Sequence, residues 1–345
     1  MKKKVIIGTI GVLLVFVVIF WRTPMLIRGP GNLVSLEKAV QVNHEKDQNK
    51  GRFYVTVVQT RSATLWEMIR TFNDPFREVV NQETANNGLP TEASRLLQRN
   101  AMNTSQNAAK KLALDLAGKQ GELAYEGIFI LTASKESGLQ GKIMTGDQVI
   151  TVDDYFFNQS SDMLTYLQNR AIGDEVVLEI KREGTKKIVT GTVDLNENTG
   201  RHSLGIQFLD RTELISEIPV DIDLGAVGGP SAGLMFTLQM YTMASNHDLR
   251  QGRNIAGTGA ITLDGQVTRV GGIAEKVYSA ANGGAVAFLV PDDPISEEFR
   301  EYFPEAQSNY QEAIEANKKL ETEMVIVPVK RVQEAIDWLS KTGNK

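Results

Sequence analysis

The sequence predicts a mixed α/β protein with an inserted, β-rich domain and one N-terminal transmembrane helix. Three observations indicate this fold class. An apolar run follows a cluster of lysines at the start of the chain. In the middle, from about residue 121 to residue 200, short strands alternate with glycine turns. The remaining chain combines runs of β-forming residues with apolar residues at helical spacing, which is typical of an α/β domain.

The composition excludes several classes of protein. A chain of 345 residues, of which 42% are hydrophobic, is long enough for two or three domains with real cores. Its net charge of -5 argues against nucleic acid as a partner. Because the chain has no cysteine, it has no disulfide, no thiolate zinc site and no cysteine nucleophile. Its histidines, His44, His202 and His247, are far apart and lie in no metal-binding pattern, so we expect neither a metal nor a cofactor.

The N-terminus predicts a membrane anchor. Met1-Lys-Lys-Lys4 precedes an almost wholly apolar run from Val5 to Trp21, at the short end of the roughly 17–25 residues that a spanning helix needs. A cleaved signal peptide has the same basic start and apolar core, but no small-residue cleavage pattern follows Phe20. We therefore expect residues 1–22 to be a cytoplasmic tip and an uncleaved single-pass anchor in the cell membrane. The lysines place the N-terminus in the cytoplasm and the rest of the chain outside.

Three further segments are expected around the inserted domain. Residues 23–50, which contain Gly29-Pro-Gly31, are expected to be a linker. Residues 51–118 should form a strand, at Phe53 to Val58, and a helical segment. Residues 201–345 return to alternating elements, which are strands at Ser203–Phe208, Ile218–Leu224, Gly284–Pro291 and Met324–Val329 and helices at Ala232–Ala244, Ile273–Asn282 and Arg331–Leu339.

The inserted segment, residues 119–200, resembles a PDZ domain. The resemblance rests on the strand Gly127-Ile-Phe-Ile130, the turn Gly138-Leu-Gln-Gly-Lys142 and the stretch Thr145-Gly-Asp-Gln-Val-Ile150. A PDZ domain binds an extended peptide by adding it to a sheet edge. The resemblance implies that the peptide lies along this edge strand, with its terminus held by backbone N–H groups; the residues concerned are Tyr125, Glu126, Gly127, Ile128, Phe129 and Ile130. The alternative is an ordinary small β domain that only spaces the chain.

A glycine-rich turn delivers one serine to the start of an apolar helix. In Gly228-Gly229-Pro230-Ser231, the glycines permit unusual backbone angles and the proline suits the first helical turn. Ser231 then lies where the helix dipole favours the negative charge of an oxyanion. The stretch also fits the Gly-x-Ser-x-Gly elbow of α/β-hydrolases, in which an acid and then a histidine follow the serine. Here His247 follows without an intervening acid, and no motif supports a Ser-His-Asp triad in another order.

A lysine is the alternative general base for this serine. Lys276 follows Gly271-Gly272 on a predicted helix and has apolar neighbours in the sequence. A free lysine has a pKa of about 10.4, so burial must lower the pKa before the side chain can accept a proton. Thr258 could orient the lysine through its hydroxyl group, and Glu275 should point to a different face of the helix. An isolated lysine is ordinarily a solvated surface residue, but the apolar setting and the serine turn distinguish this one.

Three ordered motifs resemble the proteolytic domain of Lon-type (S16) serine proteases. They are Gly229-Pro-Ser-Ala-Gly233, Thr258-Gly-Ala-Ile-Thr-Leu-Asp-Gly265-Gln-Val267 and Val270-Gly-Gly-Ile-Ala-Glu-Lys276. The likeness covers about residues 203–340 and implies Ser231 as nucleophile and Lys276 as general base. Thr258, Gly229 and Pro230 would support them. The chain departs from the family at Ala260, where an acidic residue is usual, and at Gly228-Gly229, where Asp-Gly is common.

The family's ATPase is missing, because no Gly-x-x-x-x-Gly-Lys-Ser/Thr motif occurs. The anchor, PDZ domain and Lon-type domain together resemble the YlbL/SepM-like proteases of Gram-positive bacteria, some of which trim secreted peptide pheromones. We therefore expect a membrane-anchored, ATP-independent serine endopeptidase that acts outside the cytoplasm on peptides or unfolded proteins captured by its PDZ domain. No nucleotide or nucleic-acid partner is expected, and a homo-oligomer is compatible because Lon-type domains often form rings. The alternative is a non-catalytic, membrane-anchored PDZ adaptor with a degenerate protease domain.

Overall fold

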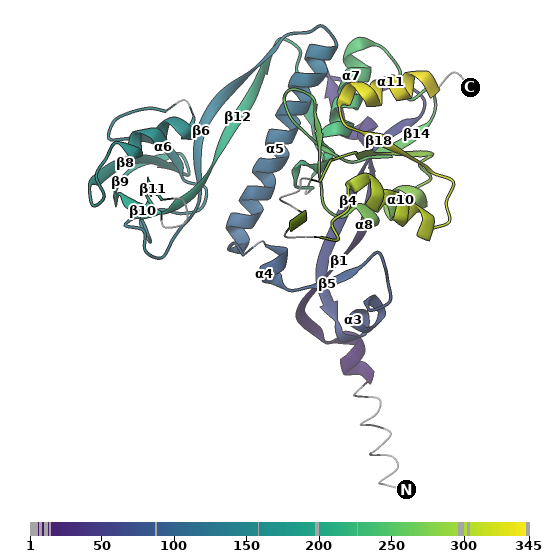
Figure 1. Cartoon of the computed structure of the whole chain (residues 1–345), viewed down its shortest axis with the longest axis horizontal. Helices are drawn as coiled ribbons and strands as arrows, with labels where there is room; N and C mark the ends of the chain where they lie inside the picture. Colours follow the sequence, from purple (N-terminus) through teal and green to yellow (C-terminus); the bar gives the residue numbers. More distant parts are fainter. Residues whose placement is uncertain are drawn as a thin grey trace. The chain divides into compact units, whose positions relative to one another are not determined.

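The computed structural model describes residues 6, 9, 13, 15–86, 88–157, 159–196, 200–225, 227–295, 300–301 and 304–342 (Figure 1). The chain forms two compact units. The first unit contains Met1–Gly88, Pro219–Val227 and Ser231–Lys345, and the second contains Leu89–Ile218 and Gly228–Pro230. The second unit is therefore an insertion into the first, and three residues of the serine turn group with it.

The predicted anchor, Val5–Trp21, lies partly outside the described residues. Within the part of the chain that the structure describes, no helix is both long and apolar enough to cross a membrane. The anchor therefore stays a prediction of the sequence.

A six-stranded sheet forms the centre of the first unit. Its strands, in spatial order, are β18 (Val325–Val329), β17 (Ala287–Pro291), β14 (Asn254–Gly257), β4 (Arg52–Thr64), β1 (Arg22–Ser35) and β5 (Glu78–Val80). The strands from β18 to β4 run parallel, and β1 pairs antiparallel with both β4 and β5. The strand predicted at Phe53 to Val58 is thus confirmed, and it lies in one sheet with strands from the C-terminal third of the chain.

The linker predicted over residues 23–50 is wrong. Most of it is regular structure: β1 begins at Arg22, and α2 (Leu36–Ala39), β2 (Val40–Val42) and β3 (Glu45–Lys46) follow. The stretch Gly29-Pro-Gly31, which suggested a linker, lies inside β1, where the pairing with β4 shifts register between Pro30 and Leu33. A β-bulge accommodates glycine and proline without ending the strand. The glycine and proline residues therefore wrongly indicated a linker.

Helices cover both faces of the first unit's sheet (Figure 1). On one face α8 (Ile273–Asn282) and α10 (Asn309–Lys319) share a core with Ala256 of β14 and Phe288 of β17. On the other face α7 (Gly233–Ser245) brings Met235 against Gly257 of β14, and α11 (Val332–Thr342) packs beside α7. The remaining elements are α3 (Leu65–Thr71), α4 (Gln82–Ala85), β13 (Val220–Ile222), β15 (Ala260–Ile261) and β16 (Val267–Thr268).

The second unit joins a long helix to a five-stranded antiparallel sheet. The helix is α5 (Thr91–Leu116), and the strands, in spatial order, are β12 (Ile206–Ser216), β6 (Gly121–Ala133), β7 (Gln148–Val152), β8 (Glu175–Arg182) and β9 (Thr185–Thr192). A short helix, α6 (Ser160–Gln168), and a hairpin, β10 (Asp194–Asn196) with β11 (Arg201–Ser203), complete the unit. Met163 and Leu167 of α6 pack into the core beneath the sheet.

β6 is not an edge strand, contrary to the prediction. β12 pairs with it over its whole length and places Phe208–Asp210 opposite Ile128–Ile130, while β7 pairs with its other side. β12 begins where a strand of the C-terminal domain was predicted, at Ser203–Phe208, yet it belongs to the sheet of the second unit. An apolar alternation indicates that a strand forms, but its partner is decided by contacts far apart in the sequence.

Candidate active site

Ser231 lies in a short 3₁₀ helix, η1 (Pro230–Ala232), directly before the first turn of α7 (Gly233–Ser245). The preceding Gly229 has a φ of 91°, in the region that glycine alone adopts readily. Ser231 is partly exposed, and its carbonyl oxygen accepts hydrogen bonds from Gly259 N at 2.8 Å and Thr258 Oγ1 at 3.0 Å. These two bonds fix the serine backbone to the chain that leaves β14.

The glycine turn before the serine is held by α5. Gly229 N donates to the carbonyl oxygen of Gln98 at 3.1 Å, and Ser105 Oγ donates to the carbonyl oxygen of Pro230 at 2.8 Å. Gln98 and Ser105 are seven positions apart, so they lie on one face of the helix. Sequence reasoning missed both residues because no motif marks them and their partners lie more than 120 residues away.

Lys276 is buried on α8, and its ammonium group reaches Thr258. The residue is 4% exposed, and Nζ donates to Thr258 Oγ1 at 3.1 Å. Burial lowers the pKa of Lys276 to about 8, although the nearby Glu275 carboxylate opposes this shift. The predicted contact between the lysine and the threonine is therefore confirmed.

Thr258 contacts both members of the predicted dyad. Its hydroxyl group accepts the hydrogen bond from Lys276 and donates one to the carbonyl oxygen of Ser231. Among the described residues, the Lys276 ammonium makes this one hydrogen bond, and none joins it directly to Ser231 Oγ. The arrangement places the Ser231 backbone and a lysine of low pKa around one threonine. A serine hydroxyl and a neutral lysine are the groups that acyl transfer by a Ser-Lys pair requires.

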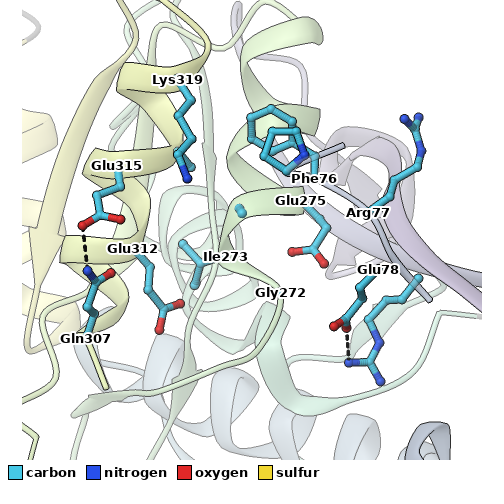
Figure 2. A pocket seen from close by; sticks show the side chains of 14 residues that line it. Phe76, Arg77, Glu78, Gly272, Ile273, Glu275, Gln307, Glu312, Glu315 and Lys319 are labelled. Carbon is cyan, nitrogen blue, oxygen red and sulfur yellow. Dashed lines mark hydrogen bonds and ion pairs between the residues drawn. The ribbon is translucent and has the colours of Figure 1, made fainter. Parts of the chain in front are cut away.

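Glu275 points away from Lys276, as predicted. Its side chain lines a cavity of about 340 Å³ in the first unit (Figure 2). Lys276 instead turns to Thr258. Burial raises the pKa of Glu275. The sequence indicated the direction of this side chain but not the cavity, which is also formed by α10 and by residues near β5.

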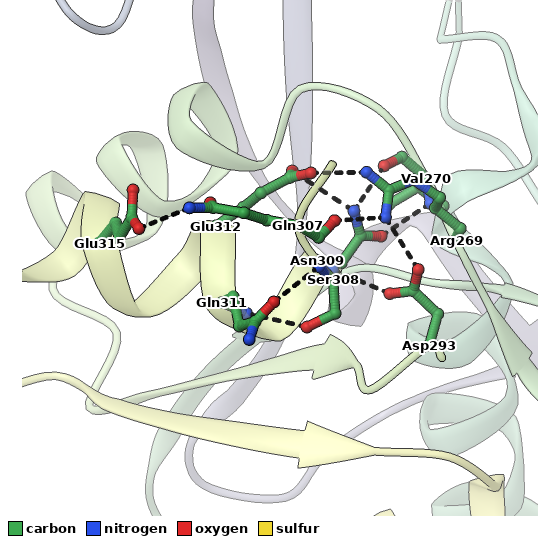
Figure 3. Close-up of polar contacts among 9 residues, drawn as sticks. All are labelled: Arg269, Val270, Asp293, Gln307, Ser308, Asn309, Gln311, Glu312 and Glu315. Carbon is green, nitrogen blue, oxygen red and sulfur yellow. Dashed lines mark hydrogen bonds and ion pairs between the residues drawn. The ribbon is translucent and has the colours of Figure 1, made fainter. Parts of the chain in front are cut away.

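A polar network fixes the segment that leads into α8 (Figure 3). Asn309 is fully buried; its side chain accepts from Val270 N at 2.8 Å and donates to the carbonyl oxygen of Val270 at 3.0 Å. Beside it, Arg269 donates to Glu312 of α10 at 2.6 Å. Gly272 then begins the helix with a φ of 71°. The network and the glycine together set where Lys276 lies, one turn later.

Within the described part of the chain, neither a histidine partner nor a metal site accompanies the serine. Among the described residues, no group of three or more histidine, aspartate and glutamate side chains could hold a metal ion. His247 lies in the loop after α7, with its ring centroid 6.5 Å from that of Tyr241.

The residues predicted to bind a peptide all lie in β6, and their groups are already engaged. Ile128 and Ile130 are buried in the core of the second unit. The other contacts are Tyr125 Oη to Asp210 at 3.0 Å, Glu126 to Arg211 at 3.1 Å, Gly127 packed against Gln148 and Phe129 beneath the Arg211 guanidinium at 4.5 Å. Because β12 also occupies the backbone edge, peptide addition at Ile128–Ile130 would require β12 to leave.

A larger cavity lies elsewhere in the second unit. It measures about 650 Å³, and its walls include Leu96 and Arg99 of α5, Ile130 and Ala133 of β6, and residues of the loop before β7. Ile130 is thus a predicted peptide-binding residue that borders an open space.

Comparison with protein families identifies both domains. Residues 207–339 match the family model of the Lon protease (S16) C-terminal proteolytic domain, and residues 105–193 match that of the PDZ domain. The chain therefore carries a Lon-type proteolytic domain and a PDZ domain, as its motifs predicted. The S16 match supports a hydrolase of the serine protease class.

Individual relatives match over short segments. The mitochondrial Lon protease homolog of Emericella nidulans is 36% identical over 93 residues, which are 26% of this chain and 8% of that protein. The Lon protease of Erwinia amylovora is 30% identical over 122 residues, which are 35% of this chain and 13% of that protein. The chain thus matches only a small part of the length of these relatives.

Among solved structures, the PDZ domain of an SdrC-like protein from Listeria monocytogenes is 17% identical with a TM-score of 0.24, covering 26% of this chain and 93% of that one.

Proposed function

We propose that this chain is a serine endopeptidase in which Ser231 is the nucleophile and Lys276 the general base. The observation that carries the proposal is the contact of both residues with Thr258. A lysine with a pKa of about 8 is neutral in an appreciable fraction of molecules near neutral pH, so it can accept a proton. The Lon-type match over residues 207–339 supports the same assignment.

The reaction begins when Ser231 Oγ turns to Lys276 Nζ, gives up its proton and attacks the scissile carbonyl carbon. The N-terminal turn of α7 stabilises the developing oxyanion through its dipole and its outward N–H groups. Collapse of the tetrahedral intermediate breaks the C–N bond, and the lysine ammonium returns the proton to the leaving amine. Water then hydrolyses the ester on Ser231, with Lys276 again as base. Thr258 is a positioning residue that holds Nζ in place between these transfers.

Cleavage of an unstructured protein tests this proposal. The full chain in detergent micelles is the suitable form, because β1 begins at Arg22 and a form shortened into residues 23–50 would lose part of the sheet. We expect Ser231→Ala and Lys276→Met each to slow cleavage roughly a thousandfold or more. Lys341→Met, at an exposed lysine of α11, is the matched control and should cleave normally. Equal cleavage by wild type and Ser231→Ala would sink the proposal.

A serine-reactive acylating probe separates the peptidase from the adaptor. The peptidase should become labelled at Ser231, and Lys276→Met should abolish labelling because the serine then lacks its base. A folded wild-type protein that is neither labelled nor proteolytic would instead be a non-catalytic adaptor.

We propose that the substrates are flexible peptides or unfolded chains captured by the PDZ domain. The absence of an ATPase motif supports this class, since unfolding a stable protein needs a motor. The cavity beside Ile130 supports capture in the second unit. Met144 at its border is 59% exposed, so Met144→Trp should narrow the cavity. The variant should raise KM for an unfolded protein and leave cleavage of a very short peptide unchanged. Equal KM values of variant and wild type for the unfolded protein would exclude this cavity as the substrate-binding site.

We propose that the chain is anchored in the cell membrane with its two domains outside, where it could process secreted peptides. The three lysines and the apolar run from Val5 to Trp21 support this topology. The cysteine-free chain permits a direct test with single cysteines at Lys3 and at Phe72, which is 89% exposed. A membrane-impermeant maleimide on intact cells should label Phe72→Cys, and should label Lys3→Cys only after lysis. The opposite pattern would reverse the topology.

A further inference from the structure

One carboxylate near the dyad, that of Glu275, has no side-chain hydrogen bond or ion pair within the described part of the chain. Glu275 is 9% exposed, and its side chain forms no hydrogen bond or ion pair with another residue that the structure describes. Burial raises the pKa of Glu275, the Glu78 carboxylate adds to this shift, and the Arg28 guanidinium opposes it. The backbone N–H of Glu275 is the one donor printed for this nearly buried carboxylate, which therefore keeps hydrogen-bonding capacity for a further partner.

The Glu275 carboxylate points into the cavity of about 340 Å³ that opens between α8, α10 and the segment before β5 (Figure 2). The wall is mixed: Phe76, Ile273 and Ala316 supply apolar groups beside several charged side chains. An apolar patch next to a carboxylate suits an aliphatic stem that ends in the opposite charge.

The other acids around the cavity already have donors. Glu78 pairs with Arg28 at 2.8 Å, Glu312 pairs with Arg269 at 2.6 Å, and Glu315 accepts from a glutamine amide at 2.6 Å (Figure 2, Figure 3). Glu275 is therefore the carboxylate left for a ligand.

The lining cations leave Glu275 unpaired. Arg28 and Arg77 are engaged with Glu78 and Asp74. Lys319 is exposed on α10 and makes no ion pair with Glu275 in the described part of the chain. The cavity consequently offers an incoming cation a carboxylate that forms no ion pair with a described side chain, although Arg28 and Lys276 act on it at longer range.

We propose that this cavity binds an organic cation, namely the ammonium or guanidinium group of a basic side chain in a peptide. A charge-assisted hydrogen bond to Glu275 would satisfy the buried carboxylate, and the apolar patch would contact the stem of the ligand. A metal ion does not fit, because no group of three or more metal-ligating side chains occurs among the described residues. The inference goes beyond the proposed peptidase chemistry, since neither Ser231 nor Lys276 lines the cavity.

Titration calorimetry tests the proposal on the Ser231→Ala protein, which cannot consume the peptide and keeps the result independent of catalysis. The probe is a Gly-Arg-Gly peptide blocked at both ends, compared with the neutral citrulline and the acidic glutamate peptides of the same design. We expect the arginine peptide to bind at least about tenfold more tightly than the citrulline peptide. Glu275→Gln should remove at least about tenfold in affinity for the arginine peptide. Glu83→Gln, at an exposed glutamate of α4, is the matched control and should not change the affinity.

Thermal unfolding keeps the test decisive if a variant is unstable. The arginine peptide should raise the melting temperature of the parent protein but not that of Glu275→Gln, provided that both unfold cooperatively. Lys319→Met should bind the arginine peptide as tightly as the parent or more tightly. Equal binding of the arginine and citrulline peptides, preference for the glutamate peptide, or unchanged affinity in Glu275→Gln would each overturn the proposal.

Discussion

At the level of single residues, the chemistry depends on how little water reaches Lys276. A solvated lysine with a pKa of about 10.4 is neutral in well under 1% of molecules at pH 8. Burial lowers the pKa of Lys276 to about 8, which makes roughly half of the side chains neutral at that pH. The gain in usable base is therefore about a hundredfold. Thr258 contributes by holding Nζ at a defined position.

The pH dependence of cleavage should report this lysine. We expect kcat/KM for an unstructured protein to rise with pH and to level off above about 8, because Lys276 must be neutral to accept the serine proton. Glu275→Gln should move the midpoint to lower pH, since the Glu275 carboxylate raises the pKa of Lys276. A midpoint near the ordinary lysine value of about 10.4 would show that Lys276 is solvated in the working enzyme.

Thr258 can be tested by shape-matched substitutions. Thr258→Val removes the hydroxyl group that bonds to both Lys276 and Ser231, and should lower kcat about 10-fold to 100-fold, corresponding to about 1–3 kcal/mol. Thr258→Ser keeps the hydroxyl group and should retain most of the rate. The KM value should change little in either variant, because the threonine orients the base rather than the substrate. Full activity in Thr258→Val would remove the threonine from the mechanism.

At the level of elements, α8 carries Lys276 to the serine through a tight entry turn. Gly272 has a φ of 71°, and a Cβ atom there would lie 2.6 Å from Val58 Cγ2 of β4. The adjacent Gly271 faces open space. Only Gly272 therefore needs to be glycine for its backbone angle and its close contact, although the sequence shows the two glycines as an equivalent pair.

The two glycines should respond differently to alanine. Gly272→Ala should destabilise the protein by about 1–3 kcal/mol, because alanine is strained in the left-handed region and clashes with Val58. Gly271→Ala should stay within about 0.5 kcal/mol of wild type. Urea unfolding measures both, and cleavage assays should show reduced activity for Gly272→Ala alone. Equal stability of the two variants would contradict the close approach of α8 to β4.

At the level of the whole molecule, the second unit interrupts the first unit in sequence, but the six-stranded sheet of the first unit stays whole. Strands β1 and β4 precede the second unit in sequence, yet they share a sheet with β14, β17 and β18. The PDZ domain is therefore a loop-like insertion in a Lon-type fold rather than a separate module at one end.

Nucleotide dependence is the test at this scale. Cleavage of an unstructured protein should proceed at the same rate with and without ATP and Mg²⁺, because the chain has no phosphate-binding motif. A stably folded protein should resist cleavage in both conditions and become a substrate once it is destabilised. The Ser231→Ala variant controls for contaminating proteases. Stimulation by ATP would point to a partner motor and contradict the proposed mode of action.

The sequence by itself determined the local features. The backbone angles that glycine permits predicted the serine turn. The helical spacing of apolar residues predicted the helix from Ile273 to Asn282 and the lysine on it. Both are properties of neighbouring residues. The direction of Glu275 away from Lys276 followed from helix geometry in the same way. Only the tertiary structure decided that β12 closes the edge of β6, that Gly29-Pro-Gly31 lies inside a strand, and that Glu275 lines a cavity. Strand pairing, bulges and burial arise between residues far apart in the chain, and no local pattern of amino acids specifies them.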